Sequence, residues 1–138
     1  MCIRDRATIG QQEVDWAARQ MKVLEEIKTE FSSSKPLNGL NIGACMHVTK
    51  ETANLMLTLK AAGANVALCA SNPLSTKDSV AAYLSENEIE VHAVHGVSND
   101  DFFKHLNSVL DTKPDITCLL YTSPSPRDRT RSRMPSSA

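Results

Sequence analysis

Short apolar runs alternate with amphipathic runs along the middle of this chain, and this alternation constrains the fold more than any other feature. The apolar runs predict buried strands, and the amphipathic runs have the spacing of helices. The predicted strands are residues 40–46, 65–70, 90–94 and 115–118, and the predicted helices between them are residues 50–62, 76–85 and 100–110. Strands that alternate with helices form parallel βαβ units. We therefore expect an α/β fold, a Rossmann-like parallel sheet with flanking helices.

One further helix is predicted ahead of the sheet. Apolar residues recur at helical spacing from Gln11 to Phe31, with Glu and Lys on the other face, and the Ser and Pro residues at 32–36 break this pattern. The sheet itself looks incomplete, because its fourth predicted strand runs directly into a tail of different composition.

The two ends of the chain differ from the body. Six of the seven arginines lie in the first six or the last twelve residues, and Arg-Asp-Arg occurs at both ends. From Thr122 the tail is mostly Ser, Pro and Arg, with too little apolar surface to order itself. The tail could bind nucleic acid or an anionic surface, it could be an ordinary disordered terminus, or both ends could be translated adapter sequence around an incomplete gene. We favour the third interpretation and predict non-native or disordered ends at residues 1–6 and 119–138 around a partial α/β domain at residues 7–118.

The composition of the chain argues against several classes of protein. No window approaches the ~20 apolar residues of a membrane-spanning helix, and the start does not have the pattern of a signal peptide. The four cysteines form no C-x-x-C pair, and three of them lie in apolar runs, which predicts buried free thiols in a reducing compartment. We therefore expect a cytoplasmic protein with neither a membrane nor a nucleic acid as its partner.

Polar side chains gather where the first predicted strand gives way to a helix. His47 lies at the end of the strand, and Thr49 is a good N-cap because its hydroxyl can accept a hydrogen bond from the first turn. Glu51 lies in that first turn, where the helix dipole favours negative charge. Small molecules bind beyond the carboxyl ends of the strands in open α/β sheets. We therefore expect a small-molecule site here, although a histidine such as His47 is more often packed than catalytic.

The second predicted strand ends in a loop that we expect at the same edge. Asn72-Pro73 is a turn signal, and Ser75 with Asp78 has the spacing of a capping box. Capping alone explains these residues as well as capping combined with lining a cleft, so both alternatives stay open. No metal site is indicated, because Cys45 and His47 lack partners at metal-ligand spacing.

Glycine motifs are informative by their absence from the sequence. Gly39, Gly43 and Gly63 form neither G-x-G-x-x-G nor a phosphate-binding P-loop, and no G-x-S-x-G elbow is present. We therefore expect no cofactor-binding residue in this stretch and no serine hydrolase.

Residues 45–53, Cys-Met-His-Val-Thr-Lys-Glu-Thr-Ala, resemble the C-[LM]-H-[MV]-T-x-E-T-A signature near the start of the S-adenosylhomocysteine hydrolase family. Further similar segments follow the family's order, at residues 16–17, 35–39, 63–78 and 113–116. The resemblance covers about residues 10–118 and implies an N-terminal fragment of the family's substrate-binding domain. Lys22 departs from the family, in which proline is common there, and Leu119-Leu120-Tyr121 stands where an acidic run is expected.

The resemblance implies an enzyme that reversibly hydrolyses S-adenosyl-L-homocysteine to adenosine and L-homocysteine, with a bound NAD that oxidises the ribose 3′-hydroxyl. It makes His47 the catalytic residue, placed for proton transfer near the ribose, and Glu51 an acceptor for the exocyclic amine of adenine. Met46 would pack on the base, and Asn72 and Ser75 would line the cleft. The substrate contacts implied in this way are Met46, Thr49, Glu51, Asn72 and Ser75.

The resemblance also implies that the full-length enzyme carries NAD and forms a homotetramer. Because later site residues and the NAD domain have no counterpart in this sequence, we expect this chain to bind no NAD and to be inactive alone. Two alternatives remain. One is hydrolysis of S-inosylhomocysteine, against which Glu51 argues because a carboxylate faces the purine 6-oxygen unfavourably. The other is a stand-alone flavodoxin-like binding or regulatory module.

Overall fold

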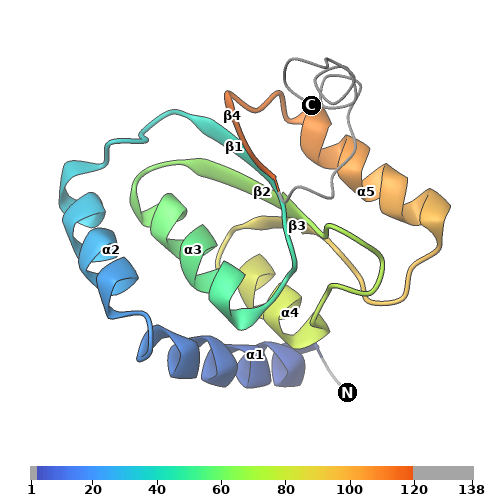
Figure 1. Ribbon diagram of the computed structural model, residues 1–138, viewed down its shortest axis with the longest axis horizontal. Helices are drawn as coiled ribbons and strands as arrows, with labels where there is room; N and C mark the ends of the chain where they lie inside the picture. Colours follow the sequence, from blue (N-terminus) through green and yellow to red (C-terminus); the bar gives the residue numbers. More distant parts are fainter. Residues whose placement is uncertain (1–2, 120–138) are drawn as a thin grey trace, which may run out of the picture.

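The computed structural model describes residues 3–119, which form five helices and four strands. In chain order these are α1 (Ile3–Ala18), α2 (Lys22–Ser34), β1 (Asn41–Cys45), α3 (Lys50–Ala61), β2 (Asn65–Cys69), α4 (Asp78–Glu86), β3 (Glu90–His92), α5 (Asn99–Asp111) and β4 (Ile116–Leu119). All strands are parallel, in the order β3-β2-β1-β4 (Figure 1). The predicted α/β architecture, with four strands and a helix ahead of them, is confirmed.

The two inner strands form the centre of the core. From their second residue onward, β1 and β2 are buried at every position, which is typical of parallel strands covered on both faces. Their register is direct, with Ala44 opposite Leu68 and Cys45 opposite Cys69. The carboxyl ends of β1 and β2 therefore finish level with one another.

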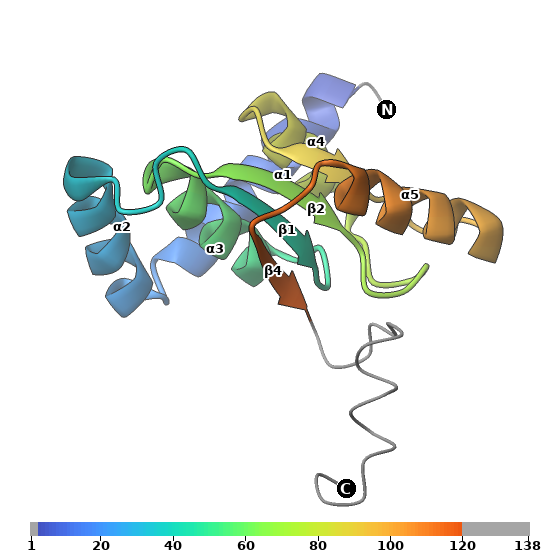
Figure 2. The same ribbon diagram turned by 90° about the horizontal axis from the view of Figure 1, so that it is seen from above.

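The two faces of the sheet carry helices of different arrangement. On one face α3 and α4 pack over larger apolar residues, α1 crosses both of these helices on their outer side, and α2 lies beside α3 (Figures 1 and 2). Within residues 3–119, the other face is covered by α5 alone, over a cluster of small side chains and Val109. The apolar residues that β1 and β2 contribute to the first face are Ile42, Ala44, Val66 and Leu68, and those of the second face are Cys45, Ala67 and Cys69.

The crossing of α1 and α4 depends on Gly10. A Cβ atom added there would lie 2.0 Å from the carbonyl oxygen of Ser79, so only glycine permits this contact between the two backbones. The close approach brings Glu13 and Val14, in the next turn of α1, to the first turns of α4 and α3. In this way α1 holds the two helices that begin at the candidate site.

The prediction of one helix over residues 11–31 is wrong. The segment forms two helices, α1 and α2, separated at residues 19–21, where Gln20 and Met21 donate to Ala17 and Ala18 in tight terminal bonds. No glycine or proline marks this break. The break lets α1 cross α3 and α4 while α2 turns to pack against α3. Residues 3–6, which the sequence analysis excluded from the fold, form the first turn of α1. Their proposed non-native origin stays a prediction.

Several predicted boundaries differ from those of the structure. The third strand ends at His92 and not at residue 94, the helix after β2 begins at Asp78 and not at residue 76, and β4 extends to Leu119, one residue into the predicted foreign tail. The other predictions for that tail, including its basic character and its disorder, concern residues outside the described range.

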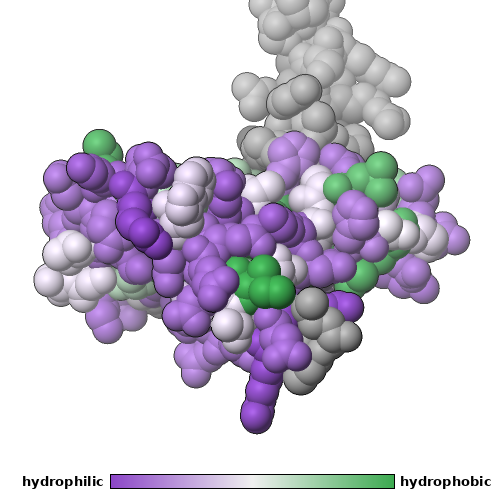
Figure 3. All heavy atoms as spheres, turned by 90° about the horizontal axis from the view of Figure 1, so that it is seen from below, coloured by the Kyte–Doolittle hydropathy of each residue, from purple (hydrophilic) through white to green (hydrophobic). Residues whose placement is uncertain are grey.

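The surface seen from the α1 side of the molecule is largely hydrophilic, with small separate apolar groups (Figure 3). Within residues 3–119, no helix has the length and apolar character needed to cross a lipid bilayer.

Candidate functional site

The turn between β1 and α3 carries the first part of the site. His47 is exposed and Thr49 is half-buried, directly beyond the carboxyl end of β1. Thr49 occupies the N-cap position with extended backbone angles, as predicted, but its side chain makes no capping bond. Its hydroxyl donates instead to the Thr52 hydroxyl at 3.5 Å, so the predicted capping interaction is wrong.

The turn between β2 and α4 carries the second part of the site. The side-chain oxygen of Asn72 accepts from the Leu74 amide at 2.9 Å. The Ser75 hydroxyl accepts from the Asn72 amide at 3.2 Å and donates to the Asn72 carbonyl at 2.9 Å. The predicted capping box of Ser75 and Asp78 is therefore wrong: the N-cap of α4 is Lys77, and Ser75 stabilises the turn itself.

A short parallel bridge joins the two turns beyond the sheet. Val48 donates to the Ser75 carbonyl at 2.9 Å, and Lys77 donates to the Val48 carbonyl at 3.0 Å. This bridge keeps Thr76 extended, which is the physical reason that α4 begins two residues later than predicted. It also brings the first turns of α3 and α4 to the same edge of the sheet.

A cavity of about 470 Å³ lies between these turns. Its volume is within the range of small-molecule sites. The lining contains four of the six predicted site residues, His47, Thr49, Asn72 and Ser75. It also contains residues that the sequence analysis did not assign, namely Leu74, Thr76, Lys77 and His95.

Ser71 orients the imidazole of His47. Its hydroxyl lies 2.8 Å from Nδ1 of His47 and 3.5 Å from the Ser75 hydroxyl. The remaining ring nitrogen, Nε2, is left to donate or accept a proton, depending on which partner of the Ser71 contact carries the hydrogen. The sequence analysis missed Ser71, although its position at the end of a strand next to Asn72 was a usable signal.

The sequence analysis assigned no role to His95, and the structure gives it a definite position. Its Nδ1 lies 3.1 Å from the Thr76 carbonyl, and its amide donates to the Asp78 carboxylate at 3.0 Å. The next residue, Gly96, donates to the Pro73 carbonyl at 2.8 Å. The loop after β3 therefore fixes the turn after β2 along one side of the cavity.

Met46 and Glu51, the other two predicted site residues, are not among the residues that line this cavity. Met46 is half-buried against the core, with its sulfur 3.6 Å from the Cys118 thiol. Glu51 is exposed in the first turn of α3. Glu51 is therefore two residues along α3 from Thr49, which does line the cavity, whereas Met46 packs against the core.

Among the described residues, the cysteines below the site form no disulfide. Cys45 and Cys69 are buried, as predicted, whereas Cys118, also predicted to be buried, is half-buried. Cys2 lies outside the described residues. The hydrogen bond between the Cys69 and Cys45 side chains, followed by burial, raises the pKa of the Cys69 thiol far above its ordinary value. Cys69 is thus a neutral packing residue and a poor nucleophile. Among residues 3–119, no three His, Cys, Asp or Glu side chains are grouped to hold a metal ion.

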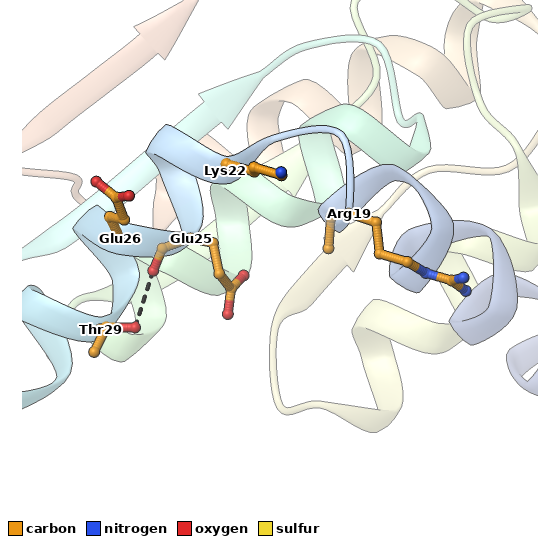
Figure 4. Close-up of a pocket in the computed structure, with 6 residues that line it drawn as sticks. Arg19, Lys22, Glu25, Glu26 and Thr29 are labelled. Atoms are coloured by element: carbon orange, nitrogen blue, oxygen red, sulfur yellow. Dashed lines mark hydrogen bonds between the residues drawn. The ribbon is translucent and has the colours of Figure 1, made fainter.

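A larger hollow of about 670 Å³ lies between α1 and α2, where Arg19, Lys22, Glu25, Glu26 and Thr29 line it. Figure 4 shows these charged side chains pointing in different directions, and the Thr29 hydroxyl donating to the carbonyl of Glu25 in its own helix. Because no polar groups converge there, the smaller cavity at the strand ends is the better candidate site.

Comparison with known proteins identifies the family of the chain. The family model described as S-adenosyl-L-homocysteine hydrolase matches residues 2–120. The chain belongs to the S-adenosyl-L-homocysteine hydrolase family. The resemblance inferred from residues 45–53 is thereby confirmed, and the cavity at the end of β1 lies within the matched region.

Curated relatives from distant organisms carry the name adenosylhomocysteinase. That of Aquifex aeolicus is 51% identical over 108 residues, which are 78% of this chain and 26% of the relative. That of Pyrococcus abyssi is 43% identical over 117 residues, 83% of this chain and 28% of the relative. That of Thermosynechococcus vestitus is 49% identical over 111 residues, 80% of this chain and 26% of the relative. The chain thus spans about a quarter of the length of these family members.

Proposed function

We propose that this chain is the nucleoside-binding part of an enzyme that hydrolyses S-adenosyl-L-homocysteine to adenosine and L-homocysteine. The single observation that carries this proposal is the cavity beyond β1 and β2, where His47, Thr49, Asn72 and Ser75 of the family-like motifs meet. Thr49 can donate to or accept from a nucleoside, and the exposed Glu51 carboxylate can accept from the exocyclic amine of adenine. His47, oriented by Ser71, is the group for proton transfer near the ribose.

Met46 takes a supporting role in this proposal. Its half-buried side chain lies between the core and the end of β1, so it forms the apolar base under the nucleoside contacts. Asn72 and Ser75 shape the opposite wall through their mutual hydrogen bonds.

NAD belongs to the longer family enzyme in this proposal and not to this chain. A dinucleotide loop needs glycines so that the backbone can approach the pyrophosphate, and the turn from Met46 to Thr49 after β1 contains none. NAD supplies the oxidation of the ribose 3′-hydroxyl when bound by the longer protein. We therefore propose that the chain alone binds no NAD and does not turn over, and that the complete enzyme is a cytoplasmic homotetramer.

The test of nucleoside binding is a titration of the isotopically labelled chain with adenosine and inosine, followed by NMR. We expect adenosine to shift the amide signals of residues 47–51 and to bind about ten-fold or more tightly than inosine, because Glu51 favours an amine over a carbonyl at the purine 6-position. Glu51→Gln should remove most of this preference. Glu86→Gln, a change at an exposed glutamate at the end of α4, is the matched control and should preserve it. Equal binding of both nucleosides to the unchanged chain would contradict the role of Glu51.

The test of the cofactor and of the fragment is chemical. Release of small molecules from the purified chain by denaturation, followed by mass spectrometry, should yield no NAD, and stoichiometric NAD would refute the proposal. Re-reading the source DNA past codon 118 should restore an open frame that begins with an acidic run. A genuine continuation into residues 119–138 would favour the stand-alone module instead.

A further inference from the structure

Two helices of the chain begin with a lysine in an unfavourable position. Lys22 is the first residue of α2 and Lys50 is the first residue of α3, and neither helix has a capping bond from its N-cap side chain. A helix N-terminus carries partial positive charge, so a lysine in the first turn is destabilising unless another group compensates its charge. The two lysines allow a comparison between a helix that begins at the candidate site and one that does not.

Of these two lysines, the one at the site is held by an aromatic ring. The Lys50 ammonium nitrogen lies 4.3 Å from the centroid of the Trp16 ring in α1, within the range of cation–π attraction. Within residues 3–119, no aromatic ring lies over Lys22. Lys50 and Trp16 line a small hollow of about 210 Å³ beside α1, and Lys50 is not among the residues of the larger cavity. The ring therefore holds the ammonium group on the α1 side of α3.

The backbone of Lys50 is held from the same side. The Asn54 side chain donates to the Lys50 carbonyl at 2.9 Å and to the Val14 carbonyl of α1 at 3.0 Å. Lys50 stands between Thr49 and Glu51, the two nucleoside contacts of the proposed function. The ends of a helix fray because their terminal groups lack partners within the helix. Holding Lys50 by both its carbonyl and its side chain therefore also holds the residues on either side of it.

We propose that Trp16 is a positioning residue for nucleoside binding: its ring holds Lys50 and keeps the first turn of α3 ordered, so that Thr49 and Glu51 are in place before a ligand binds. This rests on the proposed function for the identity of the ligand. Because a ligand binds only the fraction of molecules in which its site is formed, a loosened first turn weakens the apparent affinity by that fraction. Trp16 does not line the cavity, so it acts through Lys50.

One amide reports on the order of the first turn of α3. The first backbone hydrogen bond of α3 runs from the Ala53 amide to the Thr49 carbonyl at 2.9 Å. The same bond of α5 runs from the Phe102 amide to the Ser98 carbonyl, also at 2.9 Å. Amide hydrogen exchange followed by NMR measures the opening of each bond separately. The α5 bond is therefore an internal reference for the α3 bond.

Two variants remove the contact from either side. Trp16→Leu keeps apolar bulk and removes the aromatic face, and Lys50→Met keeps the length of the side chain and removes its charge. Each should speed the exchange of the Ala53 amide about three-fold, the size expected for an exposed cation–π contact, and leave that of Phe102 unchanged. Unchanged exchange at Ala53, or equal acceleration at Ala53 and Phe102, would overturn the proposal, because the second result is a loss of overall stability.

The matched control is the lysine without a ring. Lys22→Met makes the same change at the same position of α2 and should leave the exchange of Ala53 as it is. Lys50→Arg retains a cation that can lie over the ring, so it should restore slow exchange at Ala53. A failure of the arginine variant to restore it, or an effect of Lys22→Met as large as that of Lys50→Met, would overturn the proposal.

A double variant tests whether Trp16 acts through Lys50. Trp16→Leu combined with Lys50→Met should speed the exchange of Ala53 about three-fold, as each single change does, because both remove one contact. An effect of about nine-fold would mean that the two residues act independently and would overturn the proposal. Trp16 is the only tryptophan of the chain, so its fluorescence reports on the contact directly: Lys50→Met should change the emission, and Lys22→Met should not.

Titration with adenosine links the contact to binding and separates the two proposals. Trp16→Leu and Lys50→Met should each weaken adenosine binding about three-fold, whereas Lys50→Arg and Lys22→Met should preserve it. If adenosine binds the unchanged chain and all these variants equally, the positioning role is wrong and the nucleoside function stands. If the exchange of Ala53 responds as expected and adenosine does not bind the unchanged chain, Trp16 orders the first turn of α3 as proposed, and the nucleoside function alone loses its support.

Discussion

The helices that begin at the candidate site and the helix α5 are held in different ways at their first turns. Ser98 caps α5 with its own side chain: its hydroxyl accepts from the Asp101 amide at 3.2 Å and donates to the Asp101 carboxylate at 3.1 Å. At α3 and α4 the N-cap side chains make no such bond. The N-termini of α3 and α4 therefore have no capping bond from their N-cap side chains, whereas the N-terminus of α5 is capped by Ser98.

The uncapped helices are instead held from α1. The buried Asn54 side chain of α3 donates to the carbonyl of Val14 at 3.0 Å and to that of Lys50 at 2.9 Å. At α4, Glu13 accepts from the Ser79 hydroxyl at 3.1 Å and pairs with Lys77. These contacts lie on the α1 side of each helix. They fix the first turns without occupying the cavity, which is an arrangement suited to a preformed binding site.

The largest effect is expected from breaking the tie between α1 and α3. Asn54→Ala removes one buried and one partly buried hydrogen bond and leaves the Val14 carbonyl without the Asn54 donor, so it should lower the free energy of unfolding by about 2 kcal/mol. Urea denaturation measures the change. Asn107→Ala, at an exposed position on α5, is the control and should change stability by less than about 0.5 kcal/mol. Equal stability of the two variants would mean that α1 does not hold α3 through Asn54.

The next largest effect is expected at the self-capped helix. Ser98→Ala removes the hydroxyl that accepts from Asp101, so it should lower the free energy of unfolding by about 1 kcal/mol. Ser98→Asp retains an N-cap acceptor and should recover most of this loss. If the aspartate variant is as unstable as the alanine variant, the hydroxyl stabilises α5 by some means other than capping.

A smaller effect, on the pH dependence of stability, is expected from the Asp101 carboxylate that contacts the Ser98 cap of α5. The Ser98 hydroxyl and then Lys104 lower the pKa of Asp101 below its ordinary value of 3.8. Because the folded-state pKa is the lower one, this stabilisation is fully present above the unfolded-state pKa and is lost as the pH falls through the folded-state pKa. Between about pH 5 and pH 2.5, Asp101→Asn should therefore lose less stability than the unchanged chain. Asp100→Asn, at an exposed neighbour in the same turn, should follow the unchanged chain.

The sequence predicted the succession of strands and helices along the chain, because apolar periodicity determines it. It also placed His47, Thr49, Asn72 and Ser75 at strand ends, and these residues line one cavity. It did not predict the break at residues 19–21. No glycine or proline lies there, and the break depends on contacts of α1 with α3 and α4 that exist only in the folded chain. It assigned capping roles to Thr49 and Ser75 from their chemistry, but the bridge of Val48 with Thr76 gave both side chains other positions. Ser98 and Asp101 had the spacing of a cap and were overlooked. Local patterns thus identified residues able to cap, and tertiary contacts decided which of them do.

The smallest effect on stability is expected at Thr49. This residue gives the sharpest test of the difference between the N-terminus of α3 and that of α5. Because its hydroxyl makes no capping bond and contacts only Thr52 at 3.5 Å, Thr49→Ala should change the free energy of unfolding by less than about 0.5 kcal/mol. The same variant should weaken adenosine binding about ten-fold in the NMR titration, since it removes a nucleoside contact. Ser98→Ala should behave in the opposite way, with lower stability and unchanged adenosine binding. If Thr49→Ala lost stability as Ser98→Ala does, the hydroxyl would be an ordinary cap, and the start of α3 would not be reserved for a ligand.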